Sequence, residues 1–126
     1  MNLNQVTVPS LNVAASVDFY RSLGLELIVS SPHYARFQCP NGESSFSVHL
    51  VHELQQQSQT VVYFEVEALD ERVKLLQREG LIFTQAPQDE RWLWREARIA
   101  DPSGNVICLY WAETNRLNPP RRIIFP

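Results

Sequence analysis

Arg36 and Arg98 occupy matching sequence contexts, and their side chains are suited to binding an anion. A guanidinium group holds a carboxylate or a phosphate through paired, charge-assisted hydrogen bonds. If both arginines point into one cavity, they favour an anionic group on the ligand. In the alternative interpretation, each arginine pairs with an acid of the chain, Glu96 or Glu65, and only keeps the cavity wall neutral.

The direction of the two arginines follows from the residues beside them. Both lie between small or apolar residues in an alternating pattern, which is typical of a strand with one buried face. The expected core-facing residues are Ala35 and Phe37 in the first segment and Ala97 and Ile99 in the second. The arginines then face the opposite side of each strand, and only a β-bulge would reverse this direction.

Aromatic side chains are the second group with a possible role in binding. Trp92, Trp94, Tyr110, Tyr34 and Tyr63 could line a site for a flat ligand, because aromatic rings stack on one another. Core packing explains some of them. Trp92 lies near the start of its expected strand and could equally lie at the rim of the site.

An internal repeat contains the two arginine segments. Residues 17–25 have the same layout as residues 73–81, with Val, Gly and Leu recurring 56 positions later. Each copy predicts a short helix that ends at a glycine, Gly24 or Gly80. Residues 34–42 match residues 96–104 at a spacing of 62, so the second copy contains a loop-sized insertion of six residues.

Strand-like segments surround both expected helices. The strands are expected at 5–8, 26–31, 34–38 and 45–51 in the first copy, and at 61–66, 82–84, 92–100 and 106–111 in the second. The order is β-α-β-β-β, twice. We expect one α+β domain over residues 1–126, with modules at about 1–52 and about 60–114, a polar linker at about 53–59 and a tail at 115–126.

Composition narrows the class of protein. With 126 residues and 44% hydrophobic content, the chain fits one domain, and it has no apolar run long enough to cross a bilayer. A net charge of −3 does not favour binding to nucleic acid. Cys39 and Cys108 are far apart and suggest neither a disulfide framework nor a structural zinc site. We expect a cytoplasmic protein with no nucleic-acid or membrane partner.

Four short motifs give the chain a resemblance to a known family. They are Ser16–Tyr20, Leu23-Gly24, Phe64–Val66 and Asp101–Asn105. Together they resemble the vicinal-oxygen-chelate superfamily, which includes glyoxalases, bleomycin-resistance proteins and extradiol dioxygenases. The resemblance implies a paired, cup-shaped mixed sheet, usually in a homodimer, and it does not settle function.

The resemblance also implies four positions that bind metal in the family's metal-dependent members. In this chain they hold Gln5, His49, Val61 and Cys108. The family's usual set is His or Gln, Glu or His, His, and Glu. Valine has no lone pair, and cysteine is a soft ligand. We therefore expect no metal or other cofactor, with zinc or another divalent ion on a reduced ligand set as the alternative.

These family positions set which residues face the cavity, because residues two apart in a strand share a face. The expected ligand-binding residues are Gln5, Thr7, Tyr34, Arg36, Ser47, His49, Tyr63, Trp94, Glu96, Arg98, Cys108 and Tyr110.

Two classes of function follow. The favoured one is a metal-free protein that binds a small aromatic or anionic organic molecule. The alternative is a lyase, isomerase or dioxygenase-type enzyme, either metal-dependent or metal-free, with His49 as general base and Arg36 or Arg98 stabilising an oxyanion. The tail is too rich in proline for a helix, and its apolar end, 123–125, is expected to dock on the domain or on a partner subunit.

Overall fold

The computed structural model describes residues 1–54 and 58–124, which form two compact units. The first unit comprises Met1–Thr60 and Ala100–Asn105, and the second comprises Val61–Ile99 and Val106–Pro126. Residues 55–57 of the predicted linker lie outside the described residues. No described helix is long and apolar enough to cross a membrane.

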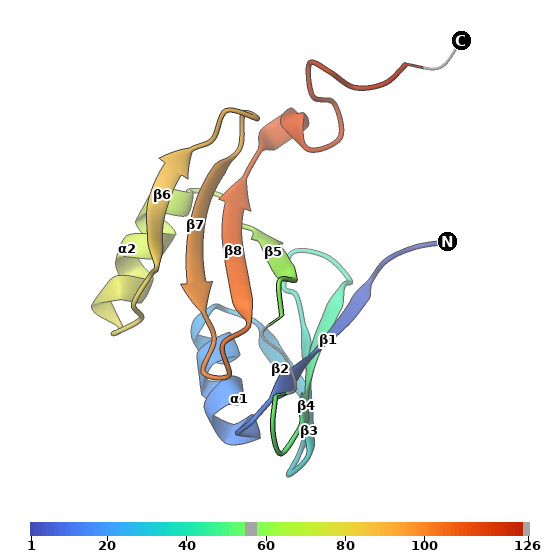
Figure 1. Ribbon diagram of the computed structural model, residues 1–126, viewed down its shortest axis with the longest axis vertical. Helices are drawn as coiled ribbons and strands as arrows, with labels where there is room; N and C mark the ends of the chain where they lie inside the picture. Colours follow the sequence, from blue (N-terminus) through green and yellow to red (C-terminus); the bar gives the residue numbers. More distant parts are fainter. Residues whose placement is uncertain (55–57, 125–126) are drawn as a thin grey trace. The chain divides into compact units, whose positions relative to one another are not determined.

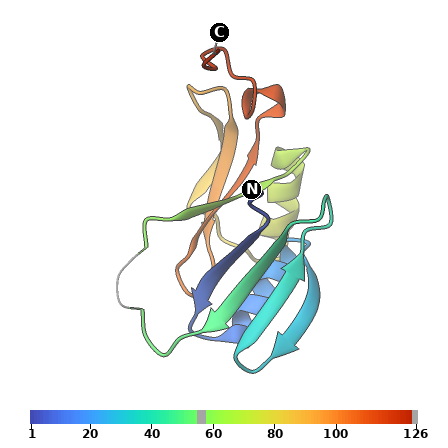
Figure 2. The same ribbon diagram turned by 90° about the vertical axis from the view of Figure 1, so that its right-hand side faces the viewer.

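The first unit contains one helix and a four-stranded mixed sheet (Figure 2). Its elements are β1 (Gln5–Ser10), α1 (Val13–Ser22), β2 (Glu26–Ser31), β3 (Tyr34–Gln38) and β4 (Ser45–Leu50). The strand order is β1-β4-β3-β2. Strands β1 and β4 are parallel, and the β2/β3 and β3/β4 pairs are antiparallel.

The second unit repeats this arrangement (Figure 1). Its elements are β5 (Val61–Glu65), α2 (Leu69–Arg78), β6 (Gln85–Asp89), β7 (Arg95–Ala100) and β8 (Val106–Trp111), followed by a short 3₁₀ helix at Glu113–Asn115. The strand order is β5-β8-β7-β6. The predicted α+β fold with β-α-β-β-β occurring twice is therefore confirmed, and α2 begins 56 residues after α1, as the repeat predicts.

Each helix covers one face of its own sheet with apolar side chains. In the first unit, the Tyr20 ring of α1 packs between Phe37 and Phe46, with ring centres 5.7 Å and 4.6 Å away. In the second unit, the buried residues that play this part are Val73, Leu76, Ala97, Ile99, Ile107 and Leu109. The expected inward direction of the residues flanking both arginines is thus confirmed.

Both helices end at glycines in the left-handed conformation. Gly24 has a φ of 101° and Gly80 a φ of 98°, values that residues with a Cβ rarely adopt. At the other end, the Asn12 side chain accepts a hydrogen bond from the Ala15 amide and caps α1. The helix ends predicted from the repeat are therefore set by local chemistry.

The predicted bounds of two strands in the second unit are wrong. A strand was expected at Ile82–Thr84, but β6 spans Gln85–Asp89. This strand pairs with β7 from Gln85 opposite Arg98, through a register shift that includes Pro87. Strand β6 lies at the edge of the sheet, where a proline without an amide proton is tolerated. Its sequence is mostly polar and lacks the apolar alternation that predicts a strand.

The strand expected at Trp92–Ala100 begins only at Arg95. The reason is a tight turn before it. The Glu90 amide donates to the Trp94 carbonyl at 2.7 Å, and Leu93 has a φ of 71°. Trp92 therefore lies in the turn that precedes β7 and not within the strand.

The Asp101–Asn105 motif holds the first unit together. The buried Asp101 carboxylate accepts hydrogen bonds from the Ser103 and Asn105 amides and from the Asn105 side chain, at 2.8–2.9 Å. It also accepts one from the Tyr20 hydroxyl at 2.6 Å. Burial and the neighbouring Asp101 raise the pKa of Tyr20, so this hydroxyl only donates. The motif is structural.

The tail does not bury its apolar end on the described part of its own chain. Ile123 and Ile124 are 72% and 88% exposed. These two residues therefore do not dock on their own unit, and docking elsewhere on the domain or on a partner subunit stays a prediction. Phe125 and Pro126 lie outside the described residues. Pro119–Arg121 do line a surface groove together with Arg91–Leu93.

The Tyr20 to Asp101 bond gives the first prediction. Tyr20→Phe should lower the free energy of unfolding by about 1.5–3 kcal/mol, because a buried carboxylate loses a donor. Urea denaturation measures this. The matched control is Tyr63→Phe on the exposed Tyr63 ring, expected to change the value by less than about 0.5 kcal/mol. Equal effects of the two substitutions would show that the buried bond does not stabilise the unit.

Candidate functional site

The sheet face opposite α1 carries a chain of polar side chains. Strand register places Gln5 opposite Ser45 and Thr7 opposite Ser47. The Gln5 amide nitrogen donates to Ser47 Oγ at 2.7 Å and to Thr7 Oγ1 at 3.1 Å, and the Gln5 amide oxygen accepts from the Ser45 hydroxyl. This amide is therefore fixed in direction by partners on both of its polar atoms.

Tyr34 and Arg36 continue this chain on β3. The Tyr34 hydroxyl lies 2.7 Å from Ser47 Oγ and accepts a hydrogen bond from Arg36 Nε at 2.9 Å. The hydrogen bond with Ser47 and the adjacent Arg36 guanidinium outweigh burial and lower the pKa of Tyr34. Arg36 itself is exposed, and within residues 1–54 and 58–124 no carboxylate lies within 4.0 Å of it.

His49, the candidate general base, shares this face but is not held in place. It lies opposite Tyr34 in the β3/β4 register and is exposed. Among the described residues, no hydrogen bond from a side chain orients its imidazole. A general base is normally positioned by such a partner, so the geometry gives His49 no particular support for that role.

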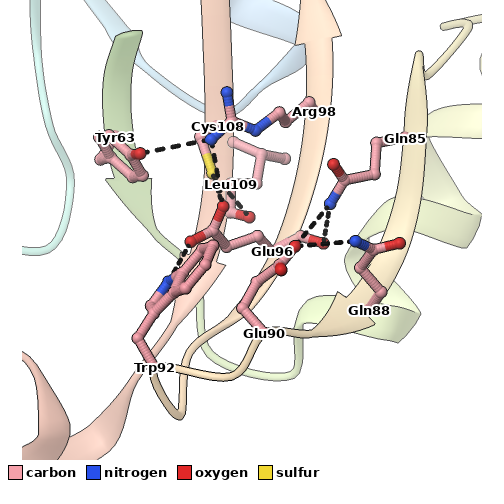
Figure 3. A network of polar contacts seen from close by, with 9 residues as sticks. All are labelled: Tyr63, Gln85, Gln88, Glu90, Trp92, Glu96, Arg98, Cys108 and Leu109. Carbon is pink, nitrogen blue, oxygen red and sulfur yellow. Dashed lines mark hydrogen bonds and ion pairs between the residues drawn. The ribbon is translucent and has the colours of Figure 1, made fainter.

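The corresponding face of the second sheet centres on a buried carboxyl group, that of Glu96 (Figure 3). Its side chain is 1% exposed. Trp92 Nε1 donates to Glu96 Oε2 at 2.8 Å, and the Cys108 thiol donates to Oε1 at 3.6 Å. Arg98 Nη2 lies 3.3 Å from the same Oε1. Glu96 is thus satisfied within its own unit.

Arg98 therefore differs from Arg36, although the two positions are equivalent in the repeat. Arg98 pairs with Glu96 and also donates to the Tyr63 hydroxyl at 3.4 Å. Burial alone would lower the pKa of Arg98, but the hydrogen bond with Glu96 and nearby negative groups raise it. For Arg98, the structure agrees with the alternative interpretation of the sequence, in which the arginine pairs with an acid of the chain.

Next to Arg98 lies an aromatic cluster formed by Tyr63, Trp94 and Tyr110. The Trp94 and Tyr110 rings are stacked, with centres 4.7 Å apart and planes inclined by 21°. Tyr63 meets both edge-on, at 5.9 Å and 5.7 Å. Trp94 Nε1 donates to the Asn115 carbonyl at 3.3 Å. The cluster is preformed, and Tyr63 leaves 43% of its surface exposed.

At three of the family's four metal positions the residues are poor metal ligands in this structure, and His49 is the exception. The Gln5 oxygen already accepts from Ser45, and Val61 offers no donor atom. Burial, then the neighbouring Glu96 carboxylate, raise the pKa of Cys108 to about 12, so the thiol keeps its proton. Across the described part of the chain, no three His, Cys, Asp or Glu side chains gather as a ligand group.

The sequence predicts that the candidate residues face one cavity, and the structure places them on two sheets. Gln5, Thr7, Tyr34, Arg36, Ser47 and His49 lie on the first, and Tyr63, Trp94, Glu96, Arg98, Cys108 and Tyr110 on the second. Gln5 and His49 belong to the first unit and Val61 and Cys108 to the second, and their convergence stays a prediction.

The sequence predicts at most a stacking role for Trp92, in the site or at its rim, and no role for Glu90. Trp92 is a direct partner of Glu96, and Glu90 accepts hydrogen bonds from Gln85 and Gln88 at 3.4 Å and 2.8 Å (Figure 3). The indole of Trp92 was noticed as an aromatic ring only. The sequence signal for this contact was the spacing of four residues between Trp92 and Glu96, which was expected to face inward.

Comparisons with known proteins agree on the family. The model of the glyoxalase/bleomycin resistance protein/dioxygenase superfamily matches residues 2–109. Among curated proteins, none matches the chain. Solved structures resemble it at low sequence identity, which supports the fold alone.

Three of these structures illustrate the likeness. A glyoxalase/bleomycin resistance protein/dioxygenase from Nocardioides is 22% identical, with a TM-score of 0.75 over 98% of this chain and 90% of its own. A bleomycin resistance determinant encoded on the transposon Tn5 is 18% identical, with 0.75 over 90% and 99%. Lactoylglutathione lyase from Agrobacterium tumefaciens is 15% identical, with 0.73 over 87% and 92%. With its family model matched over most of its length, this chain belongs to the glyoxalase/bleomycin resistance protein/dioxygenase superfamily.

Proposed function

We propose that this protein binds a small, flat organic molecule without the help of a metal ion. The observation that carries the proposal is the aromatic cluster of Tyr63, Trp94 and Tyr110 on the uncovered face of the second sheet. Its rings are already held in place, so a ligand that stacks on the half-exposed Tyr63 and Trp94 loses little freedom to the protein.

Relatives of the same fold support this class of function. One solved structure, 18% identical with a TM-score of 0.74, is a bleomycin-binding protein complexed with bleomycin. Binding of a small molecule is therefore one use of this fold, and it needs no catalytic group. The chemistry at the family's metal positions favours it further, because neither Val61 nor the protonated Cys108 is a ligand for an oxygen-preferring ion.

A metal-free enzyme is the second candidate function. The observation that favours it is Arg36, whose guanidinium lies on an uncovered face with no acid beside it in the described chain. Such a group could stabilise an oxyanion, with His49 moving a proton. Because no described side chain orients His49, we rank the enzymatic function second. Turnover of a bound compound, followed by mass spectrometry, separates the two functions.

We also expect a cytoplasmic homodimer. Ile123 and Ile124 do not dock on their own unit, and their exposed side chains offer apolar surface for a partner subunit. Truncation after Asn118 should then weaken the dimer in analytical ultracentrifugation. An unchanged association state would remove the tail from the interface.

The aromatic cluster gives a direct binding prediction. Indole, quinoline and benzamide should bind the protein in isothermal titration calorimetry, and Trp94→Ala should weaken their binding about two- to tenfold because ring stacking is lost. Trp111→Phe, which alternation in β8 places on the helix side of the sheet, is the control and should bind normally. Failure of all three compounds to bind at millimolar concentration would contradict the proposal.

The protonated state of Cys108 gives a second prediction. At pH 8, only Cys39 should react with a thiol reagent in the folded protein, since Cys108 is buried and its pKa is raised to about 12. Cys39→Ser should therefore abolish the reaction until denaturant exposes the second thiol. Rapid reaction of Cys108 in the folded Cys39→Ser protein would reopen the possibility of a metal-binding thiolate.

A further inference from the structure

The hydrogen-bond directions around Tyr34 leave its proton free for a ligand. Ser47 is fully buried, and the Gln5 amide donates to its oxygen, so the Ser47 hydroxyl proton needs an acceptor. The Tyr34 oxygen at 2.7 Å is that acceptor, and it also accepts from Arg36 Nε. An oxygen that accepts two hydrogen bonds directs its own proton elsewhere, toward the uncovered face.

Among the described residues, Arg36 keeps a pair of donors without a hydrogen-bond partner. Its Nε bonds to Tyr34, and its guanidinium carbon lies 5.4 Å from the centre of the Tyr34 ring. The two terminal nitrogens, Nη1 and Nη2, form the fork that binds the two oxygens of a carboxylate side by side. This fork and the Tyr34 hydroxyl belong to neighbouring side chains on one strand face.

The second unit shows what such an arginine binds when an acid is present. There Arg98, the counterpart of Arg36 in the repeat, pairs with the carboxyl group of Glu96. The counterpart of Glu96 in the first unit is Tyr34, which has no charge to offset Arg36. The first unit therefore has the cation of this pair without its carboxylate.

We propose that Arg36 and Tyr34 form a binding site for the carboxylate of a ligand on the uncovered face of the first sheet, with Ser47 and Gln5 as positioning residues. Two guanidinium donors and one hydroxyl donor match the acceptors of a singly charged carboxylate. A phosphate dianion carries twice the charge and more acceptor sites than this single cation satisfies. The inference goes beyond the proposed function, because the aromatic cluster lies on the other sheet, and it names carboxylates as a ligand class.

The test compares benzoate, its neutral analogue benzamide and phenyl phosphate, by isothermal titration calorimetry on the full chain. Benzoate should bind at least about tenfold more tightly than benzamide, the range for a hydrogen-bonded charged group. Arg36→Gln should weaken benzoate binding about tenfold to a hundredfold and leave benzamide binding unchanged. Arg36→Lys, which keeps the charge and loses the fork, should give an intermediate loss.

Tyr34→Phe should weaken benzoate binding up to about tenfold, since one neutral donor is removed. The matched control is Arg21→Gln, which removes the same charge from the exposed end of α1 and should change no affinity. Thermal melts of every variant check that it folds. If Tyr34→Phe fails to fold, the Arg36 variants still test the site.

Several results would overturn the proposal. Equal affinity for benzoate and benzamide would remove the carboxylate site and leave the proposed function standing. No binding of benzoate would also end the carboxylate site, and no binding of benzamide would count against the aromatic cluster. A preference for phenyl phosphate would show that the ligand class is wrong. Loss of benzoate binding on Arg98→Gln but not on Arg36→Gln would assign the anion to the second sheet.

Discussion

A single helix covers each four-stranded sheet, and this constraint shapes the rest of the molecule. Every strand must present apolar side chains to the helix and something else to the face that no helix covers. In the first unit, that other face is a chain of hydroxyl, amide and guanidinium groups from Gln5 to Arg36. In the second, it is a buried acid beside an aromatic cluster. We therefore expect the functional site on these uncovered faces.

The two faces satisfy the same requirement in different ways. Polar groups withdrawn from water need partners. The residue at one equivalent position of the repeat, Tyr34 or Glu96, decides which partners these are. Glu96 collects donors from Trp92, Arg98 and Cys108, which neutralises Arg98 and keeps the thiol protonated. Tyr34 is uncharged and only accepts a hydrogen bond from Arg36, so the charge of Arg36 is not offset by its neighbour in the way that Glu96 offsets Arg98. One exchange of residue type thus makes two equivalent arginines chemically different.

Much of the fold could be predicted from the sequence because its signals are local or repeated. Alternation around Ala35 and Ala97 gave the buried faces, and Gly24 and Gly80 gave the helix ends. Strand β6 could not be predicted, since its sequence, Gln85–Asp89, has no apolar alternation and its pairing depends on β7. The partners of Glu96 could not be chosen from sequence either. Glu65 and Glu96 were equal candidates for the arginines until the side chains were placed in space.

The central claim is that an organic ligand binds without a metal ion, and native mass spectrometry of the protein stripped with a chelator tests it most directly. After addition of indole or benzoate, the account predicts a complex whose mass is that of the protein plus the organic compound, with no metal ion. A complex that forms only when zinc or another divalent ion is restored, and that is lost on His49→Ala, would contradict it.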